Sequence, residues 1–491
     1  MSPGCTEVNV VWFKRDLRLH DHDPLKAAVA AGKPLILMYC FEPSIMASDD
    51  WDVRHGRFIQ QALADMQQGL KVRGGKLLVL HREVIAALES IRKEFSVQAL
   101  YSQQETGTQL TFDRDIALGD YCREQGLPWH EYAADGVVRR LKNRKNWVKR
   151  WYDFMEQAPA DPDWATATFA EWTEAQVQPW RGPALPAAFF ESDPQMQPGG
   201  TTYGRRYLDS FLRLRHRSYN LHLSKPVASR KSCARISPYL AWGCLSMREI
   251  VQRLKQTPSA HQWHLESFFS RLRWRSHYIQ KLEQDVSLET RNLNRGYPDL
   301  GQVVIPERIR AWEEGRTGIP LVDASMRCVA ATGYLNFRMR AMVVSFFSHQ
   351  LWQPWQIAAR YLARQFLDYE PGIHYAQHQM QAGVVGTHII RVYNPIKQAA
   401  DHDPEAEFIS RWVPELAGLP PALAREPWTM TAMEEMLYNF ERGVDYPEPI
   451  VDEEASRVHA RDVLHRMRDL PAVREDSARI IRMLSNPGRQ T

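Results

Sequence analysis

Residues 333–397 read GYLNFRMRAMVVSFFSHQLWQPWQIAARYLARQFLDYEPGIHYAQHQMQAGVVGTHIIRVYNPIK, and the rest of the chain is interpreted outward from this stretch. Its apolar residues recur every three or four positions, which predicts helices over 335–352 and 357–367. Arg338 and Arg340 lie inside the first pattern, so they need a partner or an anionic ligand. Asp368 and Glu370 are the nearest acids. They would form an ordinary ion pair between two helices, but the density of Arg, His, Gln, Tyr and Trp here favours a buried polar pocket.

The chain from residue 204 onward carries helical patterns almost exclusively. Pro238, Pro306 and Pro320 stand where first-turn prolines belong, and Ser237 precedes one of them as a natural cap. Strand patterns are nearly absent, so this part is predicted to be an all-α domain. The other helices expected in it cover 207–214, 238–254, 260–282, 306–314 and 321–331.

The first 133 residues alternate short β-rich runs with helical patterns, which predicts a doubly wound parallel α/β sheet. Such sheets bind ligands outside the carboxyl ends of their strands, and the first such end here is 14–21. No GxGxxG follows strand one, so a dinucleotide on the usual glycine turn is not expected. The expected strands cover 8–13, 34–41, 76–81, 98–103 and 129–132, and the expected helices cover 23–31, 57–72, 84–95 and 112–124.

Residues 134–200 differ in composition from both neighbours and are predicted to be a linker, between an α/β domain at 1–133 and a helical domain at 201–491. Their first part is basic and aromatic (VVRRLKNRKNWVKRW, 137–151), which suits either a solvated helix start or a contact with a phosphate backbone. The second part is rich in Pro, Asp and Ala and has little periodicity. That composition is typical of a long segment running over the surface.

Composition points to a soluble protein. Hydrophobic residues make up 44% of the 491, and no apolar run approaches the ~20 residues that a membrane span needs. The N-terminus has no secretory pattern, and the six cysteines show no CxxC spacing, so we expect reduced thiols, no metal and a cytoplasmic location. Residues 205–275 hold fifteen Lys and Arg against three acids. This excess suits nucleic acid or a phosphate-rich cofactor, although a solvated helical face would look similar.

Five collinear segments resemble the photolyase/cryptochrome flavoproteins. AWEEGRTGIPLVDASMR (311–327) is similar to that family's W-x-x-G-x-T-G-x-P-x-V-D-A-x-M-R signature at every fixed place. The other four are VVWFKRDLRLHDHDPL (10–25), ARISPYLAWGCLS (234–246), RVYNPIKQ (391–398) and DPEAEFISRWVPEL (403–416). The resemblance covers nearly the whole chain in the right order.

The resemblance implies FAD, bound in the helical domain. Ser237 and the backbone N–H groups at the start of its helix would hold the pyrophosphate, with Tyr219 nearby. Arg340 and Asp368 match the pair that brackets the flavin ring, and His374 falls opposite flavin N5. The implied cofactor-binding residues are Tyr219, Arg235, Ile236, Ser237, Arg340, Asp368, Glu370 and His374.

The implied activity is light-driven repair of cyclobutane pyrimidine dimers in damaged DNA, by one electron from excited reduced FAD. Trp274 matches a tryptophan that packs against the damaged bases, and Trp355 matches the middle member of an electron-transfer chain. Trp274, Trp355 and His374 are the implied catalytic residues. The implied DNA-facing residues are Arg271, Trp274, Arg338, Arg391 and Gln398. Glu105 is a candidate contact for a second, antenna chromophore of folate or deazaflavin type, and we expect a monomer with no membrane association.

The sequence departs from the family at several of these positions. Arg271 replaces a glutamate that hydrogen-bonds the dimer, Phe337 replaces an asparagine, and Met380 replaces a second cavity tryptophan. His378 and Gln302 replace the inner and outer members of the electron-transfer chain. The four cluster-binding cysteines of one photolyase branch and the paired histidines of (6-4) photolyases are absent.

Three functions remain open from the sequence. The first is a photolyase acting on cyclobutane dimers, which Trp274, Arg338, Gln398 and the basic stretch favour. The second is a cryptochrome-like blue-light receptor without repair activity, which Arg271, Phe337, Met380 and the altered electron chain favour. The third is a structural nucleic-acid-binding protein with a vestigial flavin pocket.

Overall fold

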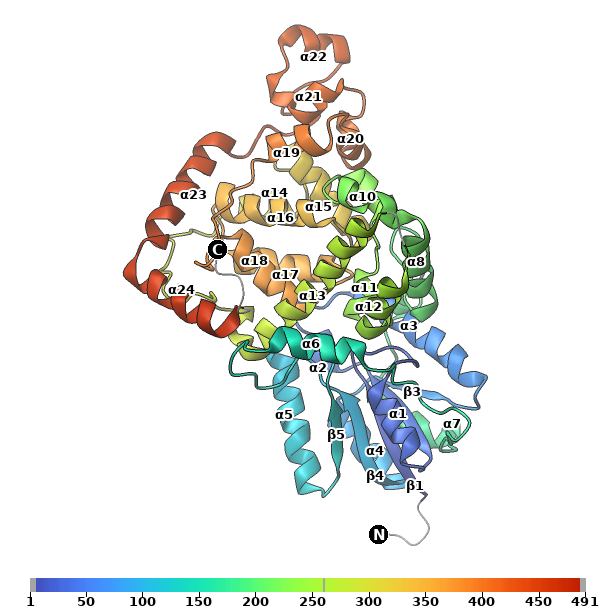
Figure 1. The fold of residues 1–491 in the computed structure, drawn as a ribbon. Helices are drawn as coiled ribbons and strands as arrows, with labels where there is room; N and C mark the ends of the chain where they lie inside the picture. Colours follow the sequence, from blue (N-terminus) through green and yellow to red (C-terminus); the bar gives the residue numbers. More distant parts are fainter. Residues whose placement is uncertain (1–5, 259–260, 486–491) are drawn as a thin grey trace.

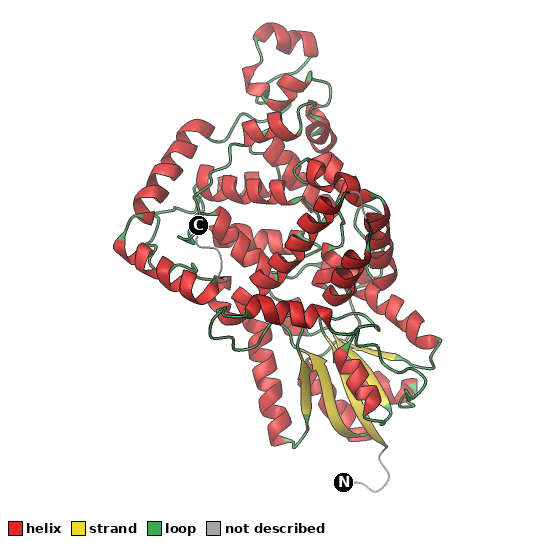
Figure 2. Cartoon of the chain, viewed as in Figure 1, coloured by secondary structure: helices red, strands yellow, loops and turns green. Residues whose placement is uncertain are grey.

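Five parallel strands form one sheet in the order β3-β2-β1-β4-β5 in the computed structural model, which describes residues 6–258 and 261–485 (Figures 1 and 2). The strands are β1 (Glu7–Phe13), β2 (Leu35–Cys40), β3 (Leu77–Leu80), β4 (Ser96–Gln103) and β5 (Trp129–Tyr132). The chain runs outward from β1 to β3 and then returns to place β4 on the other side of β1. The topological switch therefore lies between β1 and β4, as a doubly wound sheet requires, and the predicted fold class is confirmed.

Helices cover both faces of this sheet. Successive β1 residues point to opposite faces: Val11 and Phe13 pack with α1 (Asp23–Ala30) and α3 (Val53–Lys71), whereas Val10 and Trp12 pack with α4 (Val84–Glu94) and α5 (Gln109–Glu124). Every β1 residue after Glu7 is buried, as expected of a central parallel strand. A short helix, α2 (Pro43–Met46), follows β2.

From residue 201 onward the described residues form helices and no strand, apart from an isolated bridge between Arg442 and Tyr446. The all-α prediction for this part is therefore confirmed. None of the helices in the described ranges is long and apolar enough to cross a membrane. The helices are α8 (Thr201–Arg213), α9 (Tyr219–His222), α10 (Pro226–Ser232), α11 (Ser237–Ala241), α12 (Met247–Gln256), α13 (Gln262–Gln284), α14 (Pro306–Glu313), α15 (Pro320–Thr332), α16 (Phe337–Ser345), α17 (Trp355–Gln365), α18 (Pro371–Gln381), α19 (Pro395–His402), α20 (Glu407–Trp412), α21 (Pro421–Arg425), α22 (Ala432–Tyr438), α23 (Glu453–Arg468) and α24 (Pro471–Leu484).

The single helix expected over 238–254 is wrong, because the chain forms α11 and α12 there with a break between them. Gly243 at the break has a φ of +68°, and a Cβ on it would lie 2.1 Å from the Arg15 carbonyl oxygen. The close approach of the loop after β1 thus stops the first helix. The helix expected over 335–352 is shorter, since α16 passes into a π-helical turn at Phe346–Gln350. Position 260, the expected start of another helix, lies outside the described residues.

The connector packs more deeply than its composition predicts. It contains α6 (Trp147–Glu156), α7 (Glu174–Val177) and a bridge from Phe169 to Leu35 beside the sheet. Trp147 and Trp151 of the basic first part begin and continue α6 and are fully buried, so the solvated helix start is wrong for these two side chains. In Figure 1, α6 crosses the boundary between the sheet and the helical part. The domain boundaries near 133 and 200 stay predictions.

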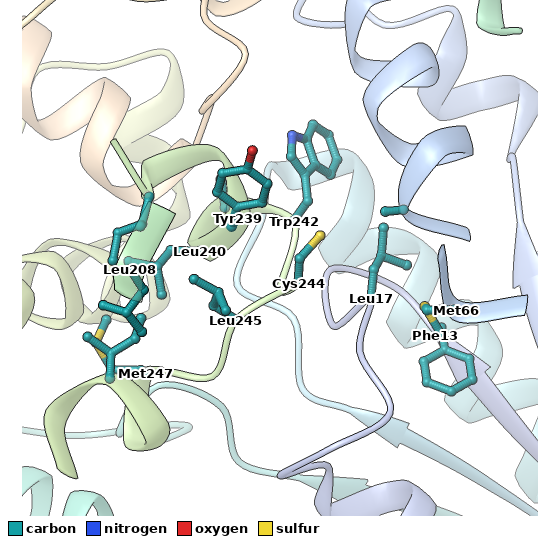
Figure 3. Packing of buried hydrophobic residues seen from close by; sticks show 14 of the residues in the cluster. Phe13, Leu17, Met66, Leu208, Tyr239, Leu240, Trp242, Cys244, Leu245 and Met247 are labelled. Carbon is teal, nitrogen blue, oxygen red and sulfur yellow. The ribbon is translucent and has the colours of Figure 1, made fainter. Parts of the chain in front are cut away.

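The loop after β1 joins the two parts of the molecule. Leu17 N–H donates to the Trp242 carbonyl (3.1 Å), and the Arg18 guanidinium donates to the Gly243 carbonyl (3.0 Å). Figure 3 shows Phe13, Leu17 and Met66 of the α/β part on one side of this core and Trp242 with Cys244 on the other. One hydrophobic core therefore spans both parts.

Candidate functional site

Arg340 of α16 and Asp368, which follows α17, form an ion pair with 2.8 Å between Nη2 and Oδ2. Arg340 also donates from Nε to the Leu335 carbonyl (2.8 Å), and its guanidinium lies 4.0 Å from the centre of the Phe366 ring. The other Asp368 oxygen, Oδ1, is buried and has no hydrogen-bond partner among the described residues. The pair therefore keeps one buried acceptor free for a ligand donor.

Three arginines surround the ring of Tyr334. Their guanidinium carbons lie 3.7 Å (Arg235), 5.5 Å (Arg230) and 5.7 Å (Arg340) from its centre. Neither Arg230 nor Arg235 forms an ion pair with any acid in the described residues, and burial lowers the pKa of Arg230. Arg235 instead donates to Gln197 (2.8 Å) and sits at a φ of +57°. Unpaired cations at this density suit a phosphate-bearing ligand.

Tyr219 lies near Tyr334, the ring that these arginines surround. It is buried against Phe211 and Phe268, with ring centres 5.7 Å away in each case. Burial is the main reason that its pKa is raised, and a hydrogen bond from Arg271 acts in the opposite direction. Ile236 and Ser237 follow Arg235 directly, with Ser237 as the first residue of α11. Five predicted residues (Tyr219, Arg235, Ile236, Ser237 and Arg340) thus come together, with Asp368 beside Arg340.

Glu370 points elsewhere. It forms a buried ion pair with Arg275 of α13 (2.7 Å), and Arg275 also contacts Asp135 (3.0 Å). These side chains line a pocket between the sheet and the helices, together with Arg15 and Gln103. The structure therefore gives Glu370 a partner in a different group from the Arg340–Asp368 pair. Sequence reasoning missed Arg275, although it lies one residue after Trp274.

His374 and His378 of α18 are buried neutral imidazoles with ring centres 4.1 Å apart. His374 Nε2 donates to the Ala359 carbonyl (2.7 Å), so its Nδ1 is an acceptor. His378 Nδ1 donates to the His374 carbonyl (2.8 Å), and its Nε2 is a buried acceptor with no partner in the described part of the chain. Burial lowers the pKa of His378 to about 4 and that of His374 well below its ordinary value, and the neighbouring His378 adds to the second shift.

Trp274 is half-buried on α13 and contacts His277 and Tyr278, with ring centres 5.2 and 5.8 Å away. Met380, which stands where a second cavity tryptophan was expected, accepts a hydrogen bond from the Tyr278 hydroxyl (3.3 Å). Arg271 is exposed one turn before Trp274. The middle of α13 therefore presents an aromatic surface with a cation beside it.

Arg338, Arg391 and Gln398 lie near the 391–398 segment. Arg338 approaches the Tyr393 hydroxyl and Ser224 Oγ, each at 3.5 Å, and its Nε is buried without a partner in the described residues. Gln398 Oε1 is likewise buried and unpaired, whereas Arg391 is exposed. These groups have donors and acceptors to spare for a polar ligand.

Trp355 begins α17 and is buried, and its Nε1 donates to Asn292 Oδ1 (2.8 Å). It packs in a cluster with Tyr297, Tyr369 and Tyr375. Gln302, in the place of the outer electron-transfer tryptophan, uses its amide to donate to two backbone carbonyls.

Glu105 lies at the carboxyl end of β4, beside the switch point of the sheet. It accepts a hydrogen bond from Arg114 (2.7 Å), which also binds Glu42 (2.9 Å) and Asp115 (2.8 Å). A pocket here is lined by Trp12, Glu42, Trp51, Glu105, Arg114 and Trp242. The sequence pointed to Glu105 but missed Arg114 and Glu42, which only the strand order brings to the same edge.

Two family models match the chain: "DNA photolyase" over residues 9–146 and "FAD binding domain of DNA photolyase" over residues 268–466. A protein named cryptochrome DASH from Gloeobacter violaceus is 29% identical over 478 residues, 91% of this chain and 93% of that protein. A deoxyribodipyrimidine photo-lyase from Vibrio cholerae is also 29% identical, over 88% of this chain and 95% of that protein.

A crystal structure of a class III photolyase from Agrobacterium tumefaciens has a similar fold. It superposes with a TM-score of 0.83 at 23% identity and covers 96% of this chain and 99% of that one. One photolyase model matches the N-terminal part and another the C-terminal part, and the relatives named cryptochrome DASH and photo-lyase match 91% and 88% of the chain, so the chain belongs to the photolyase/cryptochrome family.

Proposed function

We propose that this protein is a light-dependent DNA repair enzyme, a deoxyribodipyrimidine photolyase that splits cyclobutane pyrimidine dimers. The observation that carries the proposal is Trp274, an indole left half-buried on α13 while Arg275, Ser276, His277 and Tyr278 directly after it are buried. Stacking of a base on such a ring is worth about 1–3 kcal/mol. That free energy offsets part of the few kcal/mol needed to take a damaged base out of the duplex.

The residues around Arg340 fit FAD. Asp368 Oδ1 offers a buried acceptor to the N–H of a flavin ring, and the unpaired Arg230 and Arg235 offer cations to a pyrophosphate. When bound, FAD would supply the light-driven one-electron chemistry that opens the cyclobutane ring. The protein's own residues hold charge and exclude water: Arg340 stabilises negative charge beside it, and His374 stays neutral because of its burial.

A cryptochrome-like photoreceptor is the second candidate. Met380 occupies the place of a cavity tryptophan and is bonded to Tyr278, and Arg271 replaces an acid expected to bind the dimer. Relatives carry both names, cryptochrome DASH and photo-lyase. Trp274 favours repair, because a receptor without a nucleic-acid substrate has no need of a half-buried indole on which a base can stack.

We propose that the pocket around Glu105 takes a second, antenna chromophore of folate or deazaflavin type. Arg114 is held between three carboxylates there, and Trp12 and Trp51 supply aromatic walls for a planar ring. We further propose that the protein acts as a cytoplasmic monomer on damaged DNA.

One assay tests repair. The purified, chemically reduced holoprotein is illuminated with a dimer-containing oligonucleotide, and the recovery of thymine absorbance is followed. We expect recovery with the wild type and a loss of about tenfold or more in Trp274→Ala, whereas Trp263→Ala, which removes an exposed tryptophan from the same helix, should repair normally. No recovery in the wild type, with reversible flavin photoreduction intact, would leave the photoreceptor as the function.

A further inference from the structure

One face of α13 continues beyond Trp274 with His277, Tyr278 and Lys281. Residues three and four apart are neighbours on a helix, so these side chains form a single stripe. The ring of His277 lies 5.2 Å from Trp274, and Lys281 Nζ lies 5.5 Å from the centre of Tyr278. At a rise of 1.5 Å per residue, Lys281 stands about 10 Å beyond Trp274, the length of about three stacked nucleotides of a strand.

Two cations, Arg144 and Lys281, lie beside the neutral His277 at the far end of this stripe. Arg144, from the segment before α6, donates from Nη1 to His277 Nδ1 (3.4 Å) and from Nη2 to the His277 carbonyl (3.3 Å). Because His277 Nδ1 accepts, its proton is on Nε2. Arg144, His277 and Lys281 are only 1%, 6% and 6% exposed.

No acid offsets these charges in the described residues. Arg144, His277 and Lys281 appear in no ion pair there, and neither the His277 Nε2–H nor the Lys281 ammonium has an acceptor among them. Arg275, on the same helix, has two acidic partners, Asp135 and Glu370. A buried cation on this helix can therefore be paired with acids, and Lys281, within the described ranges, is not.

Burial without counter-charge costs free energy, and the pKa values of the cluster reflect that cost. Burial, followed by the charge of Arg144, lowers the pKa of Lys281 to about 8. Burial together with the charges of Lys281, Arg144 and His388 lowers the pKa of His277 well below its ordinary value. A bound oxyanion would supply the missing charge, whereas Arg144 Nε already donates to Gln284 Oε1 (2.6 Å).

We propose that Arg144, His277 and Lys281 form a binding site for a phosphate group, placed to hold a backbone phosphate of the strand whose base stacks on Trp274. That the bound phosphate belongs to DNA rests on the proposed function, and free inorganic phosphate is the other molecule that could supply this group. In either case Lys281 is the residue whose replacement best tests the site, because methionine keeps its apolar stem and removes only the charge.

The first arm of the experiment measures the binding of a dimer-free single-stranded oligonucleotide to the holoprotein over a series of salt concentrations. Lys281→Met should weaken binding severalfold at low salt and reduce the slope of log K against log salt by about 0.7, the value for one phosphate contact on a single strand. Lys281→Arg should keep the wild-type slope. So should Lys93→Met, which removes an exposed lysine from α4 in the sheet domain.

The second arm compares melting temperatures in inorganic phosphate and in chloride at equal ionic strength. If phosphate raises the melting temperature of the wild type but not of Lys281→Met while the salt slopes are equal, the site takes free phosphate and the strand source is wrong. If the two proteins agree in both arms, the site is wrong. If the salt slope changes in Lys281→Met but the wild type does not repair dimers, the repair function is wrong and the phosphate site is still supported.

Discussion

At the scale of single residues, the Arg340–Asp368 pair is asymmetric. Arg340 uses its donors on Asp368 and the Leu335 carbonyl, whereas Asp368 leaves Oδ1 buried and unpaired in the described residues. A purely structural ion pair would be more stable if Asp368 Oδ1 also accepted a hydrogen bond, because a buried unmade hydrogen bond costs about 1–3 kcal/mol. The pair is therefore better understood as half of a ligand site.

Arg340→Ala should greatly weaken FAD retention, because it removes the cation over Phe366 and leaves the Asp368 carboxylate buried and alone. We expect the flavin-to-protein ratio after gel filtration to fall by about tenfold or more. Arg360→Ala is the matched control. Arg360 is largely exposed on α17, and its ion pair with Asp49 is long, at 3.9 Å. A fully yellow Arg340→Ala protein would remove Arg340 from the site.

His378 supplies a test with pH. Its pKa is lowered from 6.5 to about 4 by burial, so the unfolded chain takes up a proton that the folded protein does not. Its contribution to stability is therefore lost as pH falls from 6.5 towards 4. At pH 5 this amounts to about 2 kcal/mol, at 1.36 kcal/mol per pH unit.

His378→Gln should remove this term while the amide still reaches the His374 carbonyl. Urea unfolding of the apoprotein at pH 7 and pH 5 measures it: the variant should lose about 2 kcal/mol less than the wild type on acidification. His459→Gln, which changes a histidine outside the buried set, should behave as the wild type. Equal losses in His378→Gln and the wild type would show that His378 is protonated in the fold.

At the scale of elements, the break between α11 and α12 depends on one glycine. A side chain at Gly243 would meet the backbone of Arg15 and Asp16, which cannot move aside without shifting the loop after β1. The same break turns Trp242 inward, where its Nε1 donates to the Leu367 carbonyl (2.9 Å) just before Asp368. A local turn thus helps to position the Arg340–Asp368 pair.

Gly243→Ala should therefore destabilise the protein by more than about 3 kcal/mol, since strain of ~1–2 kcal/mol at positive φ is added to a backbone clash. Gly32→Ala is the control, because Gly32 has nearly the same φ (+70°) and no atom within 4 Å of an added Cβ. It should cost only the conformational strain. Thermal unfolding of both variants checks this prediction. An equal loss of stability in the two variants would mean that the loop after β1 moves aside for the new side chain.

At the scale of the whole molecule, a buried ion pair holds the sheet and the helices together. Arg248 of α12 binds Asp21 with Nε at 2.9 and 3.1 Å from the two carboxylate oxygens. Burial alone would raise the pKa of Asp21, but hydrogen bonds from Arg248 and Ser246 lower this pKa to about 2. Its contribution is thus present above pH ~4 and is lost as pH falls towards 2.

Arg248→Met should destabilise the protein at pH 7 by about 3–5 kcal/mol, because Asp21 would keep a buried charge without its main partner. The control is Arg253→Met on the same helix α12, which breaks an exposed ion pair with Asp209 of α8. It should cost about 1 kcal/mol or less. Chemical unfolding measures both values. The difference between Arg248→Met and the wild type should shrink below pH 4, and a difference that persists there would assign the effect to packing.

Much of this architecture follows from local pattern alone. Alternating β-rich and helical runs are enough to predict a parallel sheet, and three- and four-residue spacing is enough to predict the helical part. The Arg340 and Asp368 pair could be expected because Arg340 lies inside one clear helical pattern and Asp368 directly follows the next. Local periodicity encodes which face of an element is buried, and that information is present in every short window of sequence.

What lies opposite each buried face was decided only by the tertiary structure. Glu370 pairs with Arg275 rather than joining Arg340, Gly243 ends a helix against Arg15, and Arg144 reaches His277 from the connector. Each of these contacts joins residues that are far apart in the chain. The sequence by itself therefore determined the elements and the family resemblance, whereas the partners of the buried charges depended on the three-dimensional packing, because a buried charge is stabilised by whichever group the fold brings within a few ångströms.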